Sequence, residues 1–122
     1  MSKIAITSEG PGLDDLVDPR FGRAAGFVIV DLENMNTSYI DNGRSQALSQ
    51  GAGIQAAQLV ARAGVDCVLS GFVGPKAFQA LSAVKIKVVQ NLDPGMTVRQ
   101  AVEKFKRGTV QFAEGPNRGP GR

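Results

Sequence analysis

The second half of this chain alternates between segments patterned like strands and segments patterned like helices. Mostly apolar runs at 65–70 and 86–90 are typical of strands, and apolar residues recur at helical spacing within 54–64, 75–84 and 98–105. Strands that alternate with helices form parallel neighbours joined by right-handed crossovers. The alternation therefore restricts the chain to a sheet with helices packed against it.

An antiparallel hairpin is predicted ahead of this alternating part. Residues 26–31 and 37–41 have the pattern of two strands joined by a short asparagine-containing connection. A further strand is predicted at 3–7, and a long loop follows it at 8–23. The order of elements predicts an α/β fold, with a mixed five-stranded sheet flanked by helices on both faces.

Ligands of such sheets usually bind beyond the carboxyl ends of the parallel strands. In this chain those ends are followed by the loops after Thr7, Ser70 and Gln90. We therefore expect a binding site to be built from these loops and from the helix starts beside them.

The chain of 122 residues has the size of one domain. We assign residues 1–112 to that domain, with 109–113 compatible with a last short strand, and expect the Gly/Pro/Arg-rich residues 113–122 to be a disordered tail. No apolar run approaches the roughly 18 residues of a membrane span, and the start lacks the features of a secretion signal. A soluble, cytoplasmic protein without a membrane partner is expected.

The chain contains no histidine and a single cysteine, Cys67. The absence of histidine removes the usual general base at neutral pH and the commonest transition-metal ligand. Cys67 lies within a predicted strand, where a free cysteine is typically a buried apolar residue. Asp14, Asp15 and Asp18 share one loop, but no carboxylate in the first strand completes a two-metal nuclease site. The sequence predicts no enzyme activity, no catalytic residue and no side-chain metal ligand.

The positive charge of the chain is concentrated near its end. The formal net charge is +3, but residues 1–96 hold eight Lys or Arg against nine Asp or Glu, whereas residues 97–122 hold six against two. A basic last helix and tail with few aromatic residues are typical of a solvated surface rather than of a nucleic-acid-binding face. We therefore predict no nucleic-acid partner.

Two glycine-rich stretches stand at predicted helix starts. The first, GAGIQA, has the glycine spacing of a dinucleotide-binding motif, but it follows a polar loop instead of a strand. It is either a flexible entry into a closely packed helix or an anion site formed by helix-terminal N–H groups. Its candidate residues are Gly51, Ala52 and Gly53.

The second stretch, SGFVGPKAF, follows a predicted buried strand and opens a helix. Gly71 and Gly74 would let a ligand approach the backbone, and Lys76 adds charge where the helix dipole is positive. Phe72 lies between the two glycines. A complete phosphate loop needs a Ser or Thr after the lysine, which is missing, so the stretch is a poor ATPase motif. A tight strand–helix turn and an anion site both remain open.

The stretch DPRFGRA groups two arginines, an aromatic residue and a glycine, namely Arg20, Phe21, Gly22 and Arg23. Arginine is weakly hydrated and binds diffuse anionic charge well. An aromatic ring beside it can cover polarisable surface, so this group could hold a bulky, soft anion. The alternative is that an arginine pairs with Asp18 or Asp31 and locks the loop.

Three long segments together resemble a known family. They are SEGPGLDDLVDPRFGRAAGFVIVD, then GAGIQAAQLVARAGVDCVLSGFVGPKAFQAL, then TVRQAVEKFKRG, and the likeness extends from about Lys3 to Gly108. In order and spacing they are similar to the dinitrogenase iron-molybdenum cofactor-binding family of the NifX, NafY and NifB C-terminal type. This resemblance implies a ribonuclease H-like layout of the sheet and the carriage or assembly of molybdenum-containing sulfide clusters without catalysis.

Small single-domain members of this family hold a molybdenum–copper sulfide cluster without covalent attachment, which suits a chain that lacks histidine ligands. The resemblance therefore implies an anionic cluster held by positive charge and helix N-termini. The combined candidate cofactor-binding residues are Arg20, Phe21, Gly22, Arg23, Gly51, Ala52, Gly53, Gly71, Phe72, Gly74 and Lys76. The alternatives are a carrier of iron-molybdenum cofactor in nitrogenase assembly and an interaction module that presents residues 99–122 to an ATPase partner.

Overall fold

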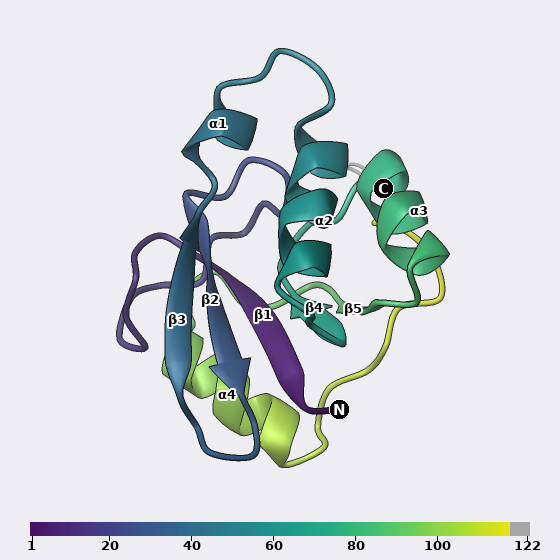
Figure 1. The fold of residues 1–122 in the computed structure, drawn as a ribbon. Coiled ribbons are helices and arrows are strands. Elements are labelled where there is room, and N and C mark those ends of the chain that lie inside the picture. The colour runs from purple at the N-terminus through teal and green to yellow at the C-terminus, as the bar shows by residue number, and fades with distance from the viewer. Residues whose placement is uncertain (118–122) are drawn as a thin grey trace.

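A computed structural model describes residues 1–117, which form one sheet with helices on both of its sides (Figure 1). In chain order, the strands are β1 (Lys3–Ser8), β2 (Gly26–Asp31), β3 (Thr37–Asp41), β4 (Cys67–Leu69) and β5 (Lys87–Val89). The helices are α1 (Gly43–Gln46), α2 (Ala52–Arg62), α3 (Pro75–Ala83) and α4 (Val98–Lys106).

The sheet is mixed and has the strand order β3-β2-β1-β4-β5. At its centre, β1 runs antiparallel to β2, with Ile6 opposite Val28, and parallel to β4, with Ile6 opposite Leu69. β5 extends the parallel half, and β3 completes the antiparallel hairpin. The predicted five-stranded mixed sheet is confirmed. A short turn joins the antiparallel strands β2 and β3, a long loop joins β1 to β2, and helix-containing connections link the parallel strands.

The two faces of the sheet carry separate apolar cores. Successive residues of a strand point to opposite faces, so Ala5 packs with α2 and α3 whereas Ile4 and Ile6 pack with α4. Both isoleucines are fully buried, and each such side chain stabilises the fold by about 1.5–3 kcal/mol. The prediction of helices on both faces is confirmed (Figure 1). The ribonuclease H-like label stays a prediction.

Local signals set several helix ends as predicted. The hydroxyl of Thr97 accepts a hydrogen bond from the Gln100 N–H, and the Gln100 side chain accepts one from the Thr97 N–H, which forms the predicted capping box of α4. Pro75 stands at the start of α3. Gly64 and Gly108 follow α2 and α4 with φ angles of 77° and 73°, a left-handed conformation that glycine adopts without steric cost.

Two expectations about loops are corrected. The short helix α1 lies where the sequence predicted only a polar loop, because four residues without an apolar stripe give no periodic signal. Within the described residues, segment 109–113 does not form a further strand. Its pairing with the sheet is one isolated bridge between Phe112 and Val89.

Residues just beyond position 112 are attached to the domain, although a disordered tail was expected from residue 113. The N–H of Ala113 donates to the Val88 carbonyl at 2.7 Å, and Asn117 forms hydrogen bonds with Val73 and Asn91. Backbone pairing at the edge strand β5 explains the difference, because glycine and proline content does not reveal such pairing. The expectation for residues 118–122 lies outside the described residues.

Candidate functional site

A cavity of about 480 Å³ opens where α2 and α3 begin. Ten of the candidate residues predicted from the sequence line it, namely Arg20, Phe21, Gly22, Arg23, Gly51, Ala52, Gly53, Phe72, Gly74 and Lys76. Four lining residues were not predicted: Ser49, Gln50, Pro75 and Ala77. Pro75 and Ala77 lie within the stretch SGFVGPKAF, although they were not chosen as candidates, and Ser49 and Gln50 directly precede GAGIQA.

The charge of this cavity distinguishes it from two larger hollows. The larger hollows, of about 590 and 720 Å³, border α4 and the segment that follows it, and each includes at least one acidic residue in its wall. The cavity at α2 and α3 is lined by Arg20, Arg23 and Lys76 and, among the described residues, by no Asp or Glu. Its charge therefore favours an anionic ligand.

Two helix starts contribute to the cavity wall. α2 follows Gly51, which has a left-handed φ of 78°, and α3 follows Gly74. Within the described chain, neither start has a side-chain cap or an acidic residue in its first turn. The first N–H groups of a helix lack intrahelical partners, and the helix dipole is positive at that end. Both starts can therefore donate hydrogen bonds to a bound anion.

Glycines bring the segments of the wall into direct contact. A Cβ atom on Gly22 would lie 2.8 Å from the backbone nitrogen of Gly53. A Cβ atom on Gly53 would lie 2.9 Å from the Cβ atom of Ala77. Both distances are shorter than packed side chains allow, so only glycine fits at these two positions. Gly53 of GAGIQA thus serves close packing of α2 against its neighbours, which was one of the two open alternatives, whereas nothing packs against the Cβ position of Gly51.

Gly71 does not have the predicted position in the site. A Cβ atom on Gly71 would lie 2.6 Å from the carbonyl oxygen of Pro19, so this glycine faces another loop rather than the cavity. The two loops also pair, because the Phe72 N–H donates to the Pro19 carbonyl at 2.6 Å and the Phe21 N–H donates to the Phe72 carbonyl at 2.9 Å. Gly71 therefore joins the β4–α3 loop to the loop after β1.

The aromatic surface of the cavity comes mainly from Phe72 rather than Phe21. Phe21 is 1% exposed and packs on Phe27 with 5.5 Å between ring centroids, so its ring belongs to the core. Phe72 is 38% exposed. The expectation that Phe21 covers the ligand is corrected, because the loop pairing directs Phe21 inward and leaves Phe72 at the surface.

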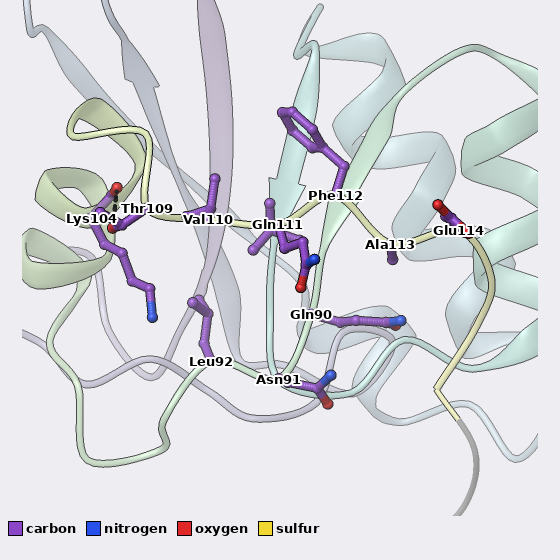
Figure 2. A pocket seen from close by; sticks show the side chains of 11 residues that line it. Gln90, Asn91, Leu92, Lys104, Thr109, Val110, Gln111, Phe112, Ala113 and Glu114 are labelled. Atoms are coloured by element: carbon purple, nitrogen blue, oxygen red, sulfur yellow. Dashed lines mark hydrogen bonds between the residues drawn. The ribbon is translucent and has the colours of Figure 1, made fainter.

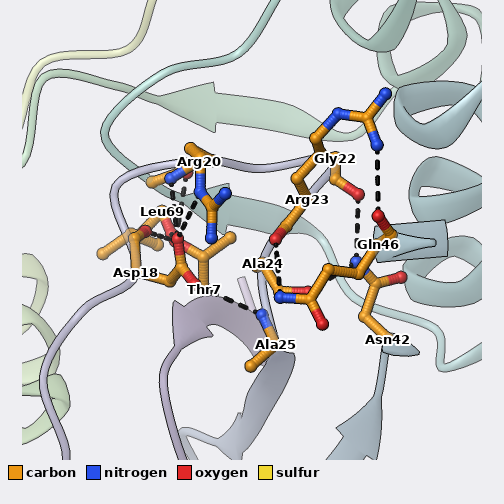
Figure 3. A network of polar contacts seen from close by, with 11 residues as sticks. Thr7, Asp18, Arg20, Gly22, Arg23, Ala24, Ala25, Asn42, Gln46 and Leu69 are labelled. Carbon is orange, nitrogen blue, oxygen red and sulfur yellow. Dashed lines mark hydrogen bonds and ion pairs between the residues drawn. The ribbon is translucent and has the colours of Figure 1, made fainter. Parts of the chain in front are cut away.

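Asp18 anchors the loop that carries the arginines (Figure 3). One carboxylate oxygen accepts from the Arg20 N–H at 3.1 Å and from the Arg20 Nε at 3.4 Å, and the other accepts from the Ala25 N–H at 3.2 Å. The predicted pairing of an arginine with Asp18 is confirmed for Arg20, whose side chain remains 54% exposed. The other predicted partner, Asp31, accepts instead from the backbone of Glu33.

Arg23 supports the wall of the cavity through backbone carbonyls. Its guanidinium donates to the carbonyls of Gln46, Leu48 and Ser49 at 3.1, 2.6 and 3.5 Å. In return, the Gln46 side chain donates to the Arg23 carbonyl at 3.2 Å (Figure 3). Arg23 thus holds the segment between α1 and α2 in place. The sequence did not predict this role, because the acceptors are backbone carbonyls, which every residue carries.

Side-chain metal ligands are not gathered anywhere in the described chain. No group of three or more His, Cys, Asp or Glu residues lies close enough to hold a metal ion within residues 1–117. Cys67 is fully buried and packs in the core beneath α4, on the opposite face of the sheet from α2 and α3. The prediction that Cys67 is a core residue is confirmed.

The Cys67 thiol is expected to resist alkylation in the folded protein at pH 8. Burial, together with the nearby Asp66 charge, raises the pKa of this thiol to about 12. At pH 8 only about one such thiol in ten thousand is the reactive thiolate. Labelling with iodoacetamide followed by mass spectrometry checks this, with protein unfolded in guanidinium as the control. Rapid labelling of the folded chain would show instead that the thiol is accessible.

None of the described helices combines the length and the apolar character that crossing a membrane requires.

The fold and the site together define a small α/β protein with a cationic cavity at two helix starts. Over residues 2–108 the chain matches the family described as "Dinitrogenase iron-molybdenum cofactor", and it belongs to that family. The family predicted from the sequence is confirmed. Its members are cofactor-binding or carrier proteins that are generally non-catalytic.

Individual relatives are similar over almost their whole length. The apo form of the orange protein from Desulfovibrio gigas is 63% identical, with a TM-score of 0.94 and coverage of 97% of this chain and 98% of that chain. A putative NifB protein from Thermotoga is 32% identical, with a TM-score of 0.83 and the same coverage. An uncharacterised protein of Methanocaldococcus jannaschii is 33% identical over 117 residues, which is 93% of each chain.

Proposed function

We propose that this protein binds and carries, without catalysis, an anionic molybdenum-containing sulfide cluster of the molybdenum–copper type in the cytoplasm. The observation that carries the proposal is the cavity of about 480 Å³ that combines two helix starts with three cationic side chains. Small-ligand sites usually have volumes of about 300–1,000 Å³. Similarity to the orange protein and membership of the cofactor family support this class of ligand.

The surface of the cavity suits a soft, bulky anion. The Arg20 guanidinium is half exposed, and a guanidinium is more weakly hydrated than an ammonium group, so it gives up water at lower cost. Phe72 adds an exposed aromatic ring at the same wall. N–H donors at the starts of α2 and α3 can bond to terminal sulfides or oxides of the cluster.

The donor set agrees with noncovalent binding. A cluster whose metals already carry sulfide ligands needs charge and hydrogen bonds from the protein rather than thiolate or imidazole donors. The chain has no histidine, and the Cys67 thiol is buried in the core beneath α4. An iron-molybdenum cofactor held by side-chain ligands would find no such ligands among the residues that line this cavity.

Anaerobic addition of tetrathiomolybdate and copper to the metal-free protein tests the proposal. After desalting, we expect a coloured protein that retains molybdenum and copper in a fixed ratio, measured by visible absorption and metal analysis. Because the Debye length falls from about 14 Å at 0.05 M salt to about 3 Å at 1 M, affinity should fall about tenfold over that range. Cys67→Ala should retain the colour, since no role is assigned to the thiol.

The possible results separate the competing functions. A colourless product would refute the cluster proposal and favour the interaction module with an ATPase partner. Retention of molybdenum without copper would refute the molybdenum–copper type. Affinity that does not change with salt would contradict binding by charge.

A further inference from the structure

We infer that Asn117 is a positioning residue for the cavity and that its attachment to the β4–α3 loop is coupled to anion binding. The inference rests on the proposed function. It concerns residues 109–117, here named the C-terminal strap, which follow α4 and cross the edge of the sheet (Figure 2). The strap lies outside the cavity, and none of its residues lines the wall.

The strap is fixed to the edge of the sheet before it reaches the site. The Ala113 N–H donates to the Val88 carbonyl at 2.7 Å, and Phe112 bridges to Val89. Further along, the side chain of Gln90 donates to the Gly115 carbonyl at 2.8 Å. Figure 2 shows the strap running alongside the residues that follow β5. These contacts place Asn117 beside the loop that follows the carboxyl end of β4.

Asn117 then binds the β4–α3 loop with both its backbone and its side chain. Its side-chain oxygen accepts from the Val73 N–H at 2.6 Å, and its own N–H donates to the Val73 carbonyl at 3.0 Å. Its side-chain nitrogen donates to the Asn91 side chain at 2.8 Å. The Asn91 N–H in turn donates to the Gly71 carbonyl at 2.8 Å. One residue thus joins the strap to both the β4–α3 loop and the segment after β5.

The β4–α3 loop is therefore held from two sides. Its Phe72 pairs with Pro19 and Phe21 of the loop after β1, whereas the neighbouring Val73 pairs with Asn117. With one partner on each side, the loop resembles the middle strand of a short three-stranded ladder. Because Phe72 and Gly74 flank Val73 and both line the cavity, the strap helps to hold these two residues in position.

This arrangement couples the strap to the ligand. When only a fraction of molecules has the β4–α3 loop in its binding position, the apparent affinity falls by that fraction. Hydrogen bonds from Asn117 raise the fraction, so the attached strap strengthens anion binding. By thermodynamic reciprocity, a bound anion must strengthen the attachment of the strap by the same factor.

The test compares the full-length chain with Asn117→Ala, with tetrathiomolybdate as the probe. We expect the dissociation constant to rise about threefold to tenfold, the range that corresponds to one or two net hydrogen bonds. Bound thiomolybdate should slow hydrogen exchange at the Val73 amide in the wild-type chain and have a smaller effect in the variant. Gln111→Ala, an exposed change within the strap, is the matched control and should behave as wild type.

A second variant tests the same contact in case Asn117→Ala does not fold. Asn91 has a φ of 68°, which glycine adopts readily, so Asn91→Gly removes the contact with Asn117 while its backbone should stay unstrained. It should weaken binding in the same direction, by about twofold to threefold. If both folded variants bind thiomolybdate as wild type does, this inference alone is overturned. If the wild-type chain binds none, the proposed function fails and the inference fails with it.

Discussion

Asp18→Ala is expected to lower the free energy of unfolding by about 2–4 kcal/mol and to weaken anion binding. The residue is 3% exposed, and its carboxylate accepts hydrogen bonds from the backbone N–H groups of Arg20 and Ala25. Removing the carboxylate leaves both N–H groups without these acceptors. Both hydrogen bonds are partly buried, and a donor left without a partner costs about 1–3 kcal/mol, which sets the size of the effect.

The effect on binding follows from the position of Asp18 in the chain. The Thr7 hydroxyl donates to the Asp18 backbone carbonyl at 2.6 Å, and its oxygen lies 3.0 Å from the Ser70 hydroxyl oxygen, so the ends of β1 and β4 meet at this point. The alanine variant keeps this backbone carbonyl but loses the carboxylate that joins Arg20 to Ala25, the residue before β2, so the loop that carries Arg20 and Arg23 is held less firmly. The Arg20 guanidinium would then lose its carboxylate partner, whereas Arg23 would keep its carbonyl acceptors.

Urea denaturation followed by circular dichroism measures the stability change. Asp14→Ala is the matched control, since it removes a carboxylate from the same loop but from a side chain that is 85% exposed and paired only at the surface with Arg99. That control should unfold at nearly the wild-type urea concentration, because exposed ion pairs contribute little. Equal stability of Asp18→Ala and the wild type would contradict the anchoring role.

The double variant Arg20→Ala/Arg23→Ala is expected to raise the dissociation constant for tetrathiomolybdate about 100-fold. Each charge-assisted hydrogen bond contributes about 1.5–3 kcal/mol, and the loss of two such groups without full additivity corresponds to this factor. Titration monitored by visible absorption measures the change. The salt dependence of binding should also become shallower, because two of the three cations that line the cavity are removed.

The two arginines should act in different ways when changed singly. Arg20→Ala removes a half-exposed charge and should mainly affect affinity and its salt dependence. Arg23→Ala also removes the donors to the carbonyls of residues 46, 48 and 49, so it should speed amide exchange in the segment before α2. Arg23→Lys keeps the charge but lacks the planar fork, and should speed this exchange while weakening binding less.

Arg62→Ala provides a control that removes one positive charge far from the cavity. Arg62 lies in the last turn of α2, about 15 Å along the helix from its start, where salt screens its effect on the cavity. It should leave the dissociation constant nearly unchanged. If the double variant binds as tightly as Arg62→Ala, the cavity at α2 and α3 is not the ligand site.

The fold and most of the cavity lining followed from short-range sequence patterns. Alternation in 3–7 and the apolar run in 26–31 indicated strands, and the Thr97–Gln100 capping box and Gly108 marked the ends of α4, because these signals involve neighbours within one helical turn or one strand. Positive charge and glycine beside predicted helix starts pointed to ten residues that line one cavity. The helix α1 was missed because a single turn has no periodicity to detect.

Tertiary contacts decided which of these residues face the cavity and what holds them there. Pairing between the loops that follow β1 and β4 turns Phe21 into the core, exposes Phe72 and places Gly71 against Pro19. Arg23 and Asn117 bind backbone carbonyl and N–H groups that lie about 25 and 44 positions away in sequence. Every residue carries a backbone carbonyl, and every residue except proline carries an N–H group, so the sequence does not indicate which of them become partners. Only the tertiary structure brings these groups together.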